Sequence, residues 1–178
     1  ANLVDGASGP TLQKVGSGSG AVAVRIGTAD AAVDMTSISS SGAASTTFTV
    51  FENTTFTGTL ASVATGVANG VTLTLAAAKA AGKTITGTGS GSVNVTALDA
   101  TLSADLSNVT VAAGGTLTGT FTASQEFAGN FGTAGMTVSI SDGATMTVAA
   151  NLVDGADGPT LQKVGSGSGA VAVRIGTA

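Results

Sequence analysis

Short segments in which hydrophobic and small polar residues alternate recur along this chain. In AVAVRI, residues 21–26, the alternation places Val22, Val24 and Ile26 on one face and Arg25 on the other. A period of two residues is that of a β-strand with one buried face. The same pattern, rich in β-branched residues, predicts further strands at residues 46–51, 54–60, 71–75, 84–88, 93–96, 109–112, 116–122, 136–140 and 145–148.

Glycine and small polar residues separate these predicted strands, as expected of tight turns. Only AAAKAAGK, residues 76–83, indicates a helix, with Gly82 where a helix typically ends. The glycine-rich connectors, among them GSGSG at residues 16–20, are predicted to be tight turns in which some glycines have a left-handed φ. Residues 27–45 and 123–135 read as loops. Because some strand spacings are about 8 to 10 residues and others about 13 to 25, we expect coils of unequal length.

One long stretch occurs twice. Residues 1–29, ANLVDGASGPTLQKVGSGSGAVAVRIGTA, recur at residues 150–178 with a single change, Ser8 to Asp157. The offset of 149 residues exceeds the about 20 to 50 residues of one solenoid repeat, so the repeating unit is a whole module. We therefore predict that residues 1–149 form one module, that residues 150–178 begin the next, and that the natural polypeptide is a longer array.

Small residues restrict the kind of core that the chain can build. It has 27 Gly, 32 Ala, 18 Ser and 29 Thr, but only six Phe and neither Trp nor Tyr. A thick sandwich core anchored by large aromatic side chains lacks its usual material. Stacked strands suit this composition better, because each coil satisfies the backbone groups of the next around a thin core. We predict an all-β parallel β-solenoid (β-helix) of short strands, with tandem Ig-like β-sandwiches as the alternative.

Charge and missing residue types exclude several functions. With six Lys and Arg against ten Asp and Glu, and no basic run, the chain is not expected to bind nucleic acid. No hydrophobic run reaches the about 18 residues of a membrane-spanning helix. Without His or Cys there is no Ser-His-Asp triad and no disulfide. Glu52 and Glu126 lack the aromatic partners of a sugar-cleaving site. We predict that the protein is not an enzyme.

Three motifs have both a functional and a structural interpretation. AAKAAGKT, residues 77–84, loosely fits a phosphate-binding loop, but strand-like sequence follows it, which favours a turn. Asp154 and Asp157 place two carboxylates in one turn, which makes them a candidate Ca²⁺ site. Because a calcium site needs more oxygen ligands than these two residues offer, solvated turn residues are the favoured interpretation. No other cofactor is expected. The threonines of residues 116–122 share one strand face, opposite Leu117 and Phe121; an ordinary solvent-facing strand is favoured over an ice-binding surface.

Two segments carry a resemblance to known proteins. VTLTLAAAKAAGKTITGTG and SVNVTALDATLSADLSNVTV, residues 71–89 and 92–111, resemble the Ala/Gly/Thr-rich β-strand repeats of very large bacterial secreted surface proteins, including adhesins and S-layer-like chains. The resemblance implies an exported, cell-surface structural protein with parallel β-helix or β-roll architecture. The calcium-binding nonapeptide of one branch of such proteins, G-G-x-G-x-D, does not occur in this sequence.

These observations together predict a structural repeat module of an extracellular or cell-surface fibre, layer or adhesin stalk. Such a module extends by stacking strands end to end, and its partners are neighbouring copies of itself, in the same chain or in a homopolymer. The alternative is a ligand-binding repeat module of a surface adhesin that binds Ca²⁺ or carbohydrate. In that case the ligand would bind in residues 30–45 or 123–135.

Overall fold

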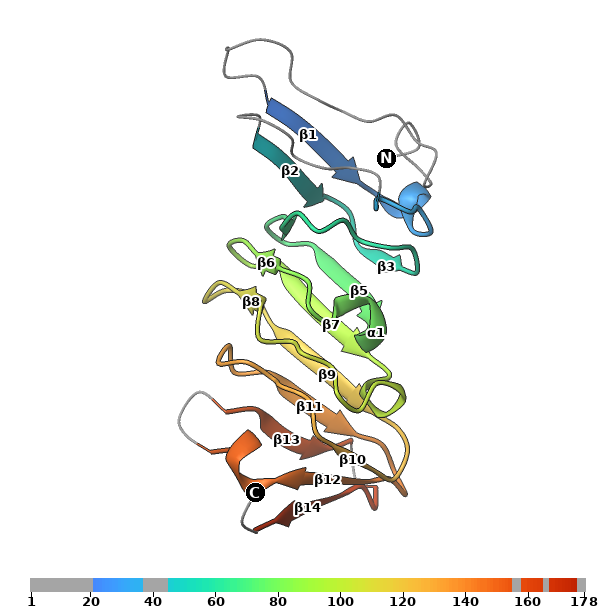
Figure 1. The fold of residues 1–178 in the computed structure, drawn as a ribbon, viewed down its shortest axis with the longest axis vertical. Helices are drawn as coiled ribbons and strands as arrows, with labels where there is room; N and C mark the ends of the chain where they lie inside the picture. The colour runs from blue at the N-terminus through green and yellow to red at the C-terminus, as the bar shows by residue number, and fades with distance from the viewer. Residues whose placement is uncertain (1–20, 37–44, 155–157, 165–166, 176–178) are drawn as a thin grey trace.

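The strands stack in parallel along one axis and form a solenoid of about seven turns (Figure 1). The computed structural model describes residues 21–36, 45–154, 158–164 and 167–175. Every strand pair within them is parallel. The prediction of a parallel β-solenoid is therefore confirmed, and the sandwich alternative, which requires antiparallel sheets, is wrong.

Three sheets form the sides of the solenoid. The first side has the strand order β1-β2-β4-β6-β8. Its strands are β1 (Ala21–Ile26), β2 (Ser45–Val50), β4 (Thr65–Val67), β6 (Ile85–Gly87) and β8 (Val109–Val111). The second side has the order β13-β11-β9-β7-β5-β3. Its strands are β3 (Thr54–Phe56), β5 (Thr72–Ala76), β7 (Ser92–Thr96), β9 (Leu117–Phe121), β11 (Thr137–Ile140) and β13 (Thr160–Lys163).

The third side changes from helical turns to strands along the axis. It begins with α1 (Ala77–Ala80), which contacts the 3-10 helix η3 (Leu98–Ala100), and η3 contacts β10. From there it continues as a sheet of order β10-β12-β14. Its strands are β10 (Gln125–Phe127), β12 (Thr145–Ala149) and β14 (Ala170–Arg174). Two further 3-10 helices are η2 (Thr28–Asp30) and η4 (Ala150–Leu152).

Strand register shows that the coils differ in length, as the sequence predicts. Phe48 pairs with Thr65, 17 residues later, whereas Thr145 pairs with Ala170, 25 residues later. The extra residues lie in the turns, because the strands themselves remain aligned from coil to coil. Coil length can therefore vary without breaking the stack.

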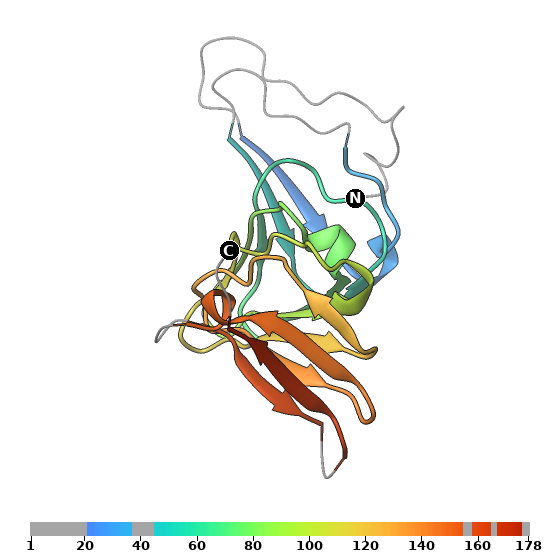
Figure 2. The same ribbon diagram turned by 60° about the horizontal axis from the view of Figure 1, so that its bottom comes forward.

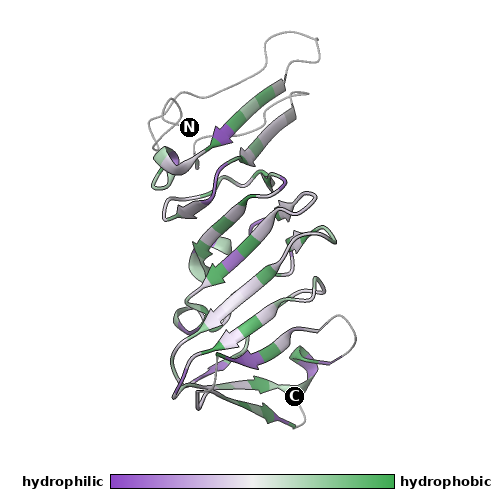
Figure 3. Ribbon diagram, turned by 180° about the vertical axis from the view of Figure 1, so that it is seen from behind, coloured by the Kyte–Doolittle hydropathy of each residue, from purple (hydrophilic) through white to green (hydrophobic). Residues whose placement is uncertain are grey.

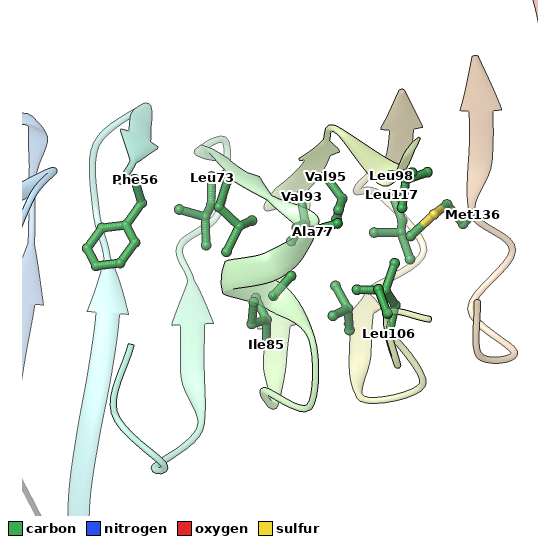
Figure 4. Close-up of a cluster of buried hydrophobic side chains, with 14 of the residues drawn as sticks. Phe56, Leu73, Ala77, Ile85, Val93, Val95, Leu98, Leu106, Leu117 and Met136 are labelled. Atoms are coloured by element: carbon green, nitrogen blue, oxygen red, sulfur yellow. The ribbon is translucent and has the colours of Figure 1, made fainter. Parts of the chain in front are cut away.

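Alternating burial along each strand builds one continuous core. In β5 the inward residues Leu73 and Leu75 are buried, while the outward residues between them are half-buried. Because the register aligns Leu73 with Val93 and Val93 with Leu117, inward side chains stack in columns along the axis (Figure 4). The strands accordingly show alternating hydrophobic and polar bands (Figure 3). Each fully buried Leu or Val contributes about 1.5–3 kcal/mol.

Glycine lines the corner between the first and second sides because backbone segments approach closely there, both within one coil and between neighbouring coils. A Cβ atom on Gly87 would lie 2.1 Å from the carbonyl oxygen of Gly91, and one on Gly115 would lie 2.2 Å from the same oxygen. Real Cβ atoms do not approach backbone this closely. A different requirement holds at Gly82, which follows α1 with a left-handed φ of +68° and occupies the predicted helix-ending position.

The prediction that glycine-rich connectors contain some left-handed glycines is confirmed at Gly70, Gly89 and Gly143, whose φ values are +72°, +59° and +75°. Residues 16–20 lie outside the described residues. In the second GSGSG segment, at residues 165–169, Gly167 and Gly169 do not have left-handed φ values. Close packing explains these glycines instead. A Cβ on Gly169 would lie 2.7 Å from the carbonyl oxygen of Ile140 in the preceding coil.

Other predicted boundaries also need correction. The strand predicted at residues 54–60 ends at Phe56, because the backbone N–H groups of Thr57 and Gly58 both donate to the carbonyl oxygen of Ala31. The predicted loop at residues 123–135 contains β10. The strands β4 and β13 were not predicted. Among the described residues, no helix is long and apolar enough to cross a membrane.

Candidate functional site at the C-terminal end

Among the described residues, the repeated segment AVAVR forms both the first strand of the solenoid and the last. At the N-terminal end it is β1, which pairs with β2 from Ala21 opposite Ser45 to Ile26 opposite Val50. Its inward side chains are covered there, and Val24 and Ile26 are only 7% and 0% exposed. A following coil thus buries this strand.

At the C-terminal end the same segment is β14, the last strand of the stack (Figure 2), and its inward side chains are exposed. β14 pairs with β12 on one edge, and no strand of the described residues pairs with the other edge. Val173, the repeat of Val24, is 49% exposed, and Ile175, the repeat of Ile26, is 89% exposed. Val171 is 39% exposed. The C-terminal end therefore combines an unpaired strand edge with an apolar surface.

The two copies of the repeated arginine make different contacts on the outward face. The Arg174 guanidinium forms an ion pair with Glu126 of β10, two strands earlier. Arg25 instead lies over the ring of Phe51, just after β2, with its guanidinium carbon 4.0 Å from the ring centroid. One arginine therefore reaches toward the preceding coils and the other toward the following coil.

A hydrogen-bonded turn fixes β14 to the coil before it. Asp142 accepts from the backbone N–H and, at 2.6 Å, from the hydroxyl of Ser168, whose own oxygen accepts from the N–H of Gly143. Asn69, Gly70 and Ser90 form the same arrangement elsewhere in the solenoid. The shared sequence signal is Asn-Gly or Asp-Gly in one coil above Gly-Ser-Gly in the next, which the sequence analysis did not identify.

This turn should make the last coil sensitive to acid. Hydrogen bonds from the Ser168 side chain and then from its backbone hold the pKa of Asp142 below its ordinary value of 3.8. Because the folded-state pKa is lowered, the stabilisation is complete above about pH 4 and is lost as the pH falls through the folded-state pKa. Asp142→Asn keeps an acceptor, as Asn69 shows, but cannot titrate. We expect melting curves between about pH 6 and about pH 2 to show a smaller loss of stability for this variant than for the natural sequence. An equal loss in both proteins would assign the acid sensitivity to other carboxylates.

The predicted metal site is not assembled in the part of the chain that the structure describes. Asp154 is exposed, and Asp157 lies outside the described residues. No group of three or more acidic side chains that could hold a metal ion occurs in the described residues. The Ca²⁺ site therefore remains a prediction.

The phosphate-loop-like motif, residues 77–84, comprises α1 and the turn that leads from it to β6. Its Lys83 side chain donates to the carbonyl oxygen of Ala61 at 3.4 Å, and β6 begins at Ile85 where a phosphate-binding loop would begin a helix. The structural interpretation of this motif is therefore confirmed.

The outward face of the second side is polar and uncharged at its centre. Register aligns Thr74 with Asn94, Asn94 with Thr118, and Thr118 with Thr137. The Thr118 hydroxyl donates to the Asn94 side-chain oxygen at 3.0 Å. Leu117 and Phe121 lie on the opposite, buried face, as predicted. This hydrogen bond thus links the polar side chains of two neighbouring coils.

Comparison of the chain with protein-family models, curated proteins and solved structures finds no match. Function must therefore be inferred from the chemistry of these surfaces. Of these surfaces, only the C-terminal end leaves hydrophobic side chains and backbone hydrogen-bonding groups unpaired together within the described residues.

Proposed function

We propose that this protein is a structural repeat module of an extracellular or cell-surface fibre, layer or adhesin stalk, which lengthens by adding β-strands at its ends. The open edge of β14 carries this proposal. Identical residues are buried in β1, where a coil follows, and exposed in β14, whose second edge pairs with no strand of the described residues. The same sequence therefore serves as an interior strand whenever another coil is present.

Physical chemistry favours covering this end. An unpaired parallel strand presents backbone N–H and C=O groups that template a further strand. Natural solenoids protect such ends with polar capping units, or they use the ends for assembly. In β14 the only charged residue is Arg174, whose guanidinium is already paired with Glu126 on the same face. This strand thus has little to prevent edge pairing.

Composition and resemblance support the location and the partners. A chain without Cys suits an exported protein that does not depend on disulfides. The Ala/Gly/Thr-rich strands resemble those of bacterial surface proteins, and the tandem repeat makes further copies of the module the natural partners. The alternative, a Ca²⁺- or carbohydrate-binding module, has no comparable feature among the described residues, where Asp154 belongs to no acidic cluster.

We expect residues 1–178 to associate in a concentration-dependent manner. Sedimentation equilibrium should show a rising average mass, and electron microscopy should show straight rods of increasing length. Val173→Asp places a charge on the open apolar surface and should abolish the rise. Thr86→Asp adds the same charge to an exposed outward position of β6, in the middle of the first side, and should leave association unchanged. A folded protein that stays strictly monomeric at millimolar concentration would contradict the proposal.

A further inference from the structure

We infer that β14 is the first strand of the next unit: its free edge takes the β2 strand, Ser45–Val50, of a second copy in the register that β1 uses, and β14 thereby replaces that copy's β1. This inference rests on the proposed function, and it specifies the surface used for assembly and the strand that binds there. It explains why the same sequence, AVAVR, is paired along one edge in β1 and along the opposite edge in β14.

In its two positions the strand uses opposite edges for pairing. In β14 the neighbour is β12, from the preceding coil, with Ala172 opposite Thr147. In β1 the neighbour is β2, from the following coil, with Ala23 opposite Thr47. Since Ala172 is the repeat of Ala23, the strand AVAVR can hold β12 on one edge and β2 on the other without any change of register. The result is a continuous sheet in the order β10-β12-β14 followed by β2-β4-β6-β8 of the second copy.

The inward side chains match across this junction. Val148 lies opposite Val173 in the existing sheet, and Phe48 lies opposite Val24, the equivalent of Val173. Val148 and Phe48 are 0% and 2% exposed, so each already belongs to the core. The junction therefore stacks Val148, Val173 and Phe48 in one buried column, as within a module. Ile175 is placed opposite Val50 in the same way.

The outward contacts are also compatible. Arg174 pairs with Glu126 on the side of the preceding coils, whereas its equivalent, Arg25, lies over Phe51 on the side of the following coil. A guanidinium can donate hydrogen bonds in its plane and stack through its face at once. One arginine at the junction can therefore contact Glu126 of one copy and Phe51 of the other.

Replacement of β1 costs the second copy little, because the incoming strand is identical to the outgoing one. β2 keeps the same neighbour sequence, while β14 gains a second paired edge and loses its exposed apolar surface. Exchange of identical elements between chains is a low-cost route to assembly, and a head-to-tail exchange of this kind forms open filaments. In a polypeptide that contains successive modules, the shared strand is present covalently, so no exchange is needed.

Disulfide trapping tests the register, because the chain has no native Cys. The donor is residues 1–178 with Ala172→Cys. The acceptor is residues 1–178 with Thr47→Cys, with Val24→Asp to weaken its own β1, and with Val173→Asp to disable its own β14. After the two are refolded together and oxidised, we expect a disulfide-linked one-to-one dimer. Within one molecule Thr47 faces Ala23, so this cross-link requires replacement of β1.

Two controls make the result specific. Moving the acceptor cysteine to Thr49→Cys keeps it on the outward face but two residues out of register, beyond the about 7 Å that a disulfide spans between Cα atoms, and should lower the yield about tenfold. Adding Val173→Asp to the donor should remove the cross-link. If Val24→Asp prevents the acceptor from folding, the acceptor with Val24 retained, refolded with donor at high concentration, should give the same cross-link at lower yield.

Absence of the Thr47→Cys cross-link, or equal yields from Thr47→Cys and Thr49→Cys acceptors, would overturn the strand replacement. Sedimentation of the unmodified protein separates this result from failure of the proposed function. Association without the cross-link retains end-to-end assembly and rejects this junction, whereas a strictly monomeric protein rejects both.

Discussion

Phe127→Ala should lower the free energy of unfolding by about 3–5 kcal/mol, the usual cost of truncating a buried phenylalanine. Phe127 is 0% exposed and its ring stacks on Phe131, with centroids 4.4 Å apart. The chain has only six Phe and a thin core, so few large neighbours can move to fill the cavity. The loss should appear as a lower denaturation midpoint in urea, monitored by circular dichroism at a concentration where the protein is monomeric.

Phe51→Ala is the matched control. Phe51 is half-buried, and its ring lies on the outward face beneath Arg25, where a cation–π contact contributes about 0.5–1 kcal/mol. We expect a loss of about 1 kcal/mol, clearly smaller than for Phe127→Ala. Similar losses for the two variants would show that the phenylalanines do not stabilise the solenoid through the burial described here.

Gly115→Ala should lower the free energy of unfolding, whereas Gly66→Ala should leave it unchanged or raise it. Neither glycine has a left-handed φ, so the outcome depends on the space at each Cβ position. At Gly115 the new methyl group would lie 2.2 Å from a backbone oxygen, which should cost about 1–3 kcal/mol or more because the coils must separate. At Gly66, within β4, the nearest atom is 3.5 Å away, an ordinary contact.

Because glycine in a strand interior is less stable than alanine by about 0.5–1 kcal/mol, Gly66→Ala should be neutral or stabilising. Thermal and urea unfolding of the two variants against the natural protein measure this difference directly. If Gly115→Ala is as stable as Gly66→Ala, the close approach of coils at the glycine corner does not exist in solution.

The fold could be predicted from sequence where period-two alternation was strong. AVAVRI and VTLTL gave strands with the correct buried faces, and the small-residue composition favoured stacked coils over a thick sandwich. The strands β4 and β10 were not predicted, because three residues are too few to show an alternation of hydrophobic and polar positions. In β10, Gln125 and Glu126 are also exposed polar residues. Their partners in neighbouring coils place them in the sheet, and that information is not local.

The candidate site could be predicted only in part. The repeat predicted that modules extend by stacking strands end to end. The hydrogen bonds between Asp142 and Ser168 were not predicted because these residues are 26 positions apart, and coil length varies too much to align them from sequence. Left-handed connector glycines could be predicted, but not the close packing at Gly167 and Gly169, since sequence alone does not show how closely another coil approaches.

The position of the repeated strand has a geometrical consequence for any array. β1 lies on the first side and β14 on the third, so from one copy of the strand to the next the chain makes about six and two-thirds turns, not a whole number. Joined through this strand, successive modules would be related by a screw operation with a rotation of about 120°. At about 4.8 Å per coil, each module would advance the axis by about 32 Å, and the third would restore the starting orientation after about 96 Å. The threonine-bearing sheets would then face three directions in succession along the filament, so that no single flank would be uniformly polar.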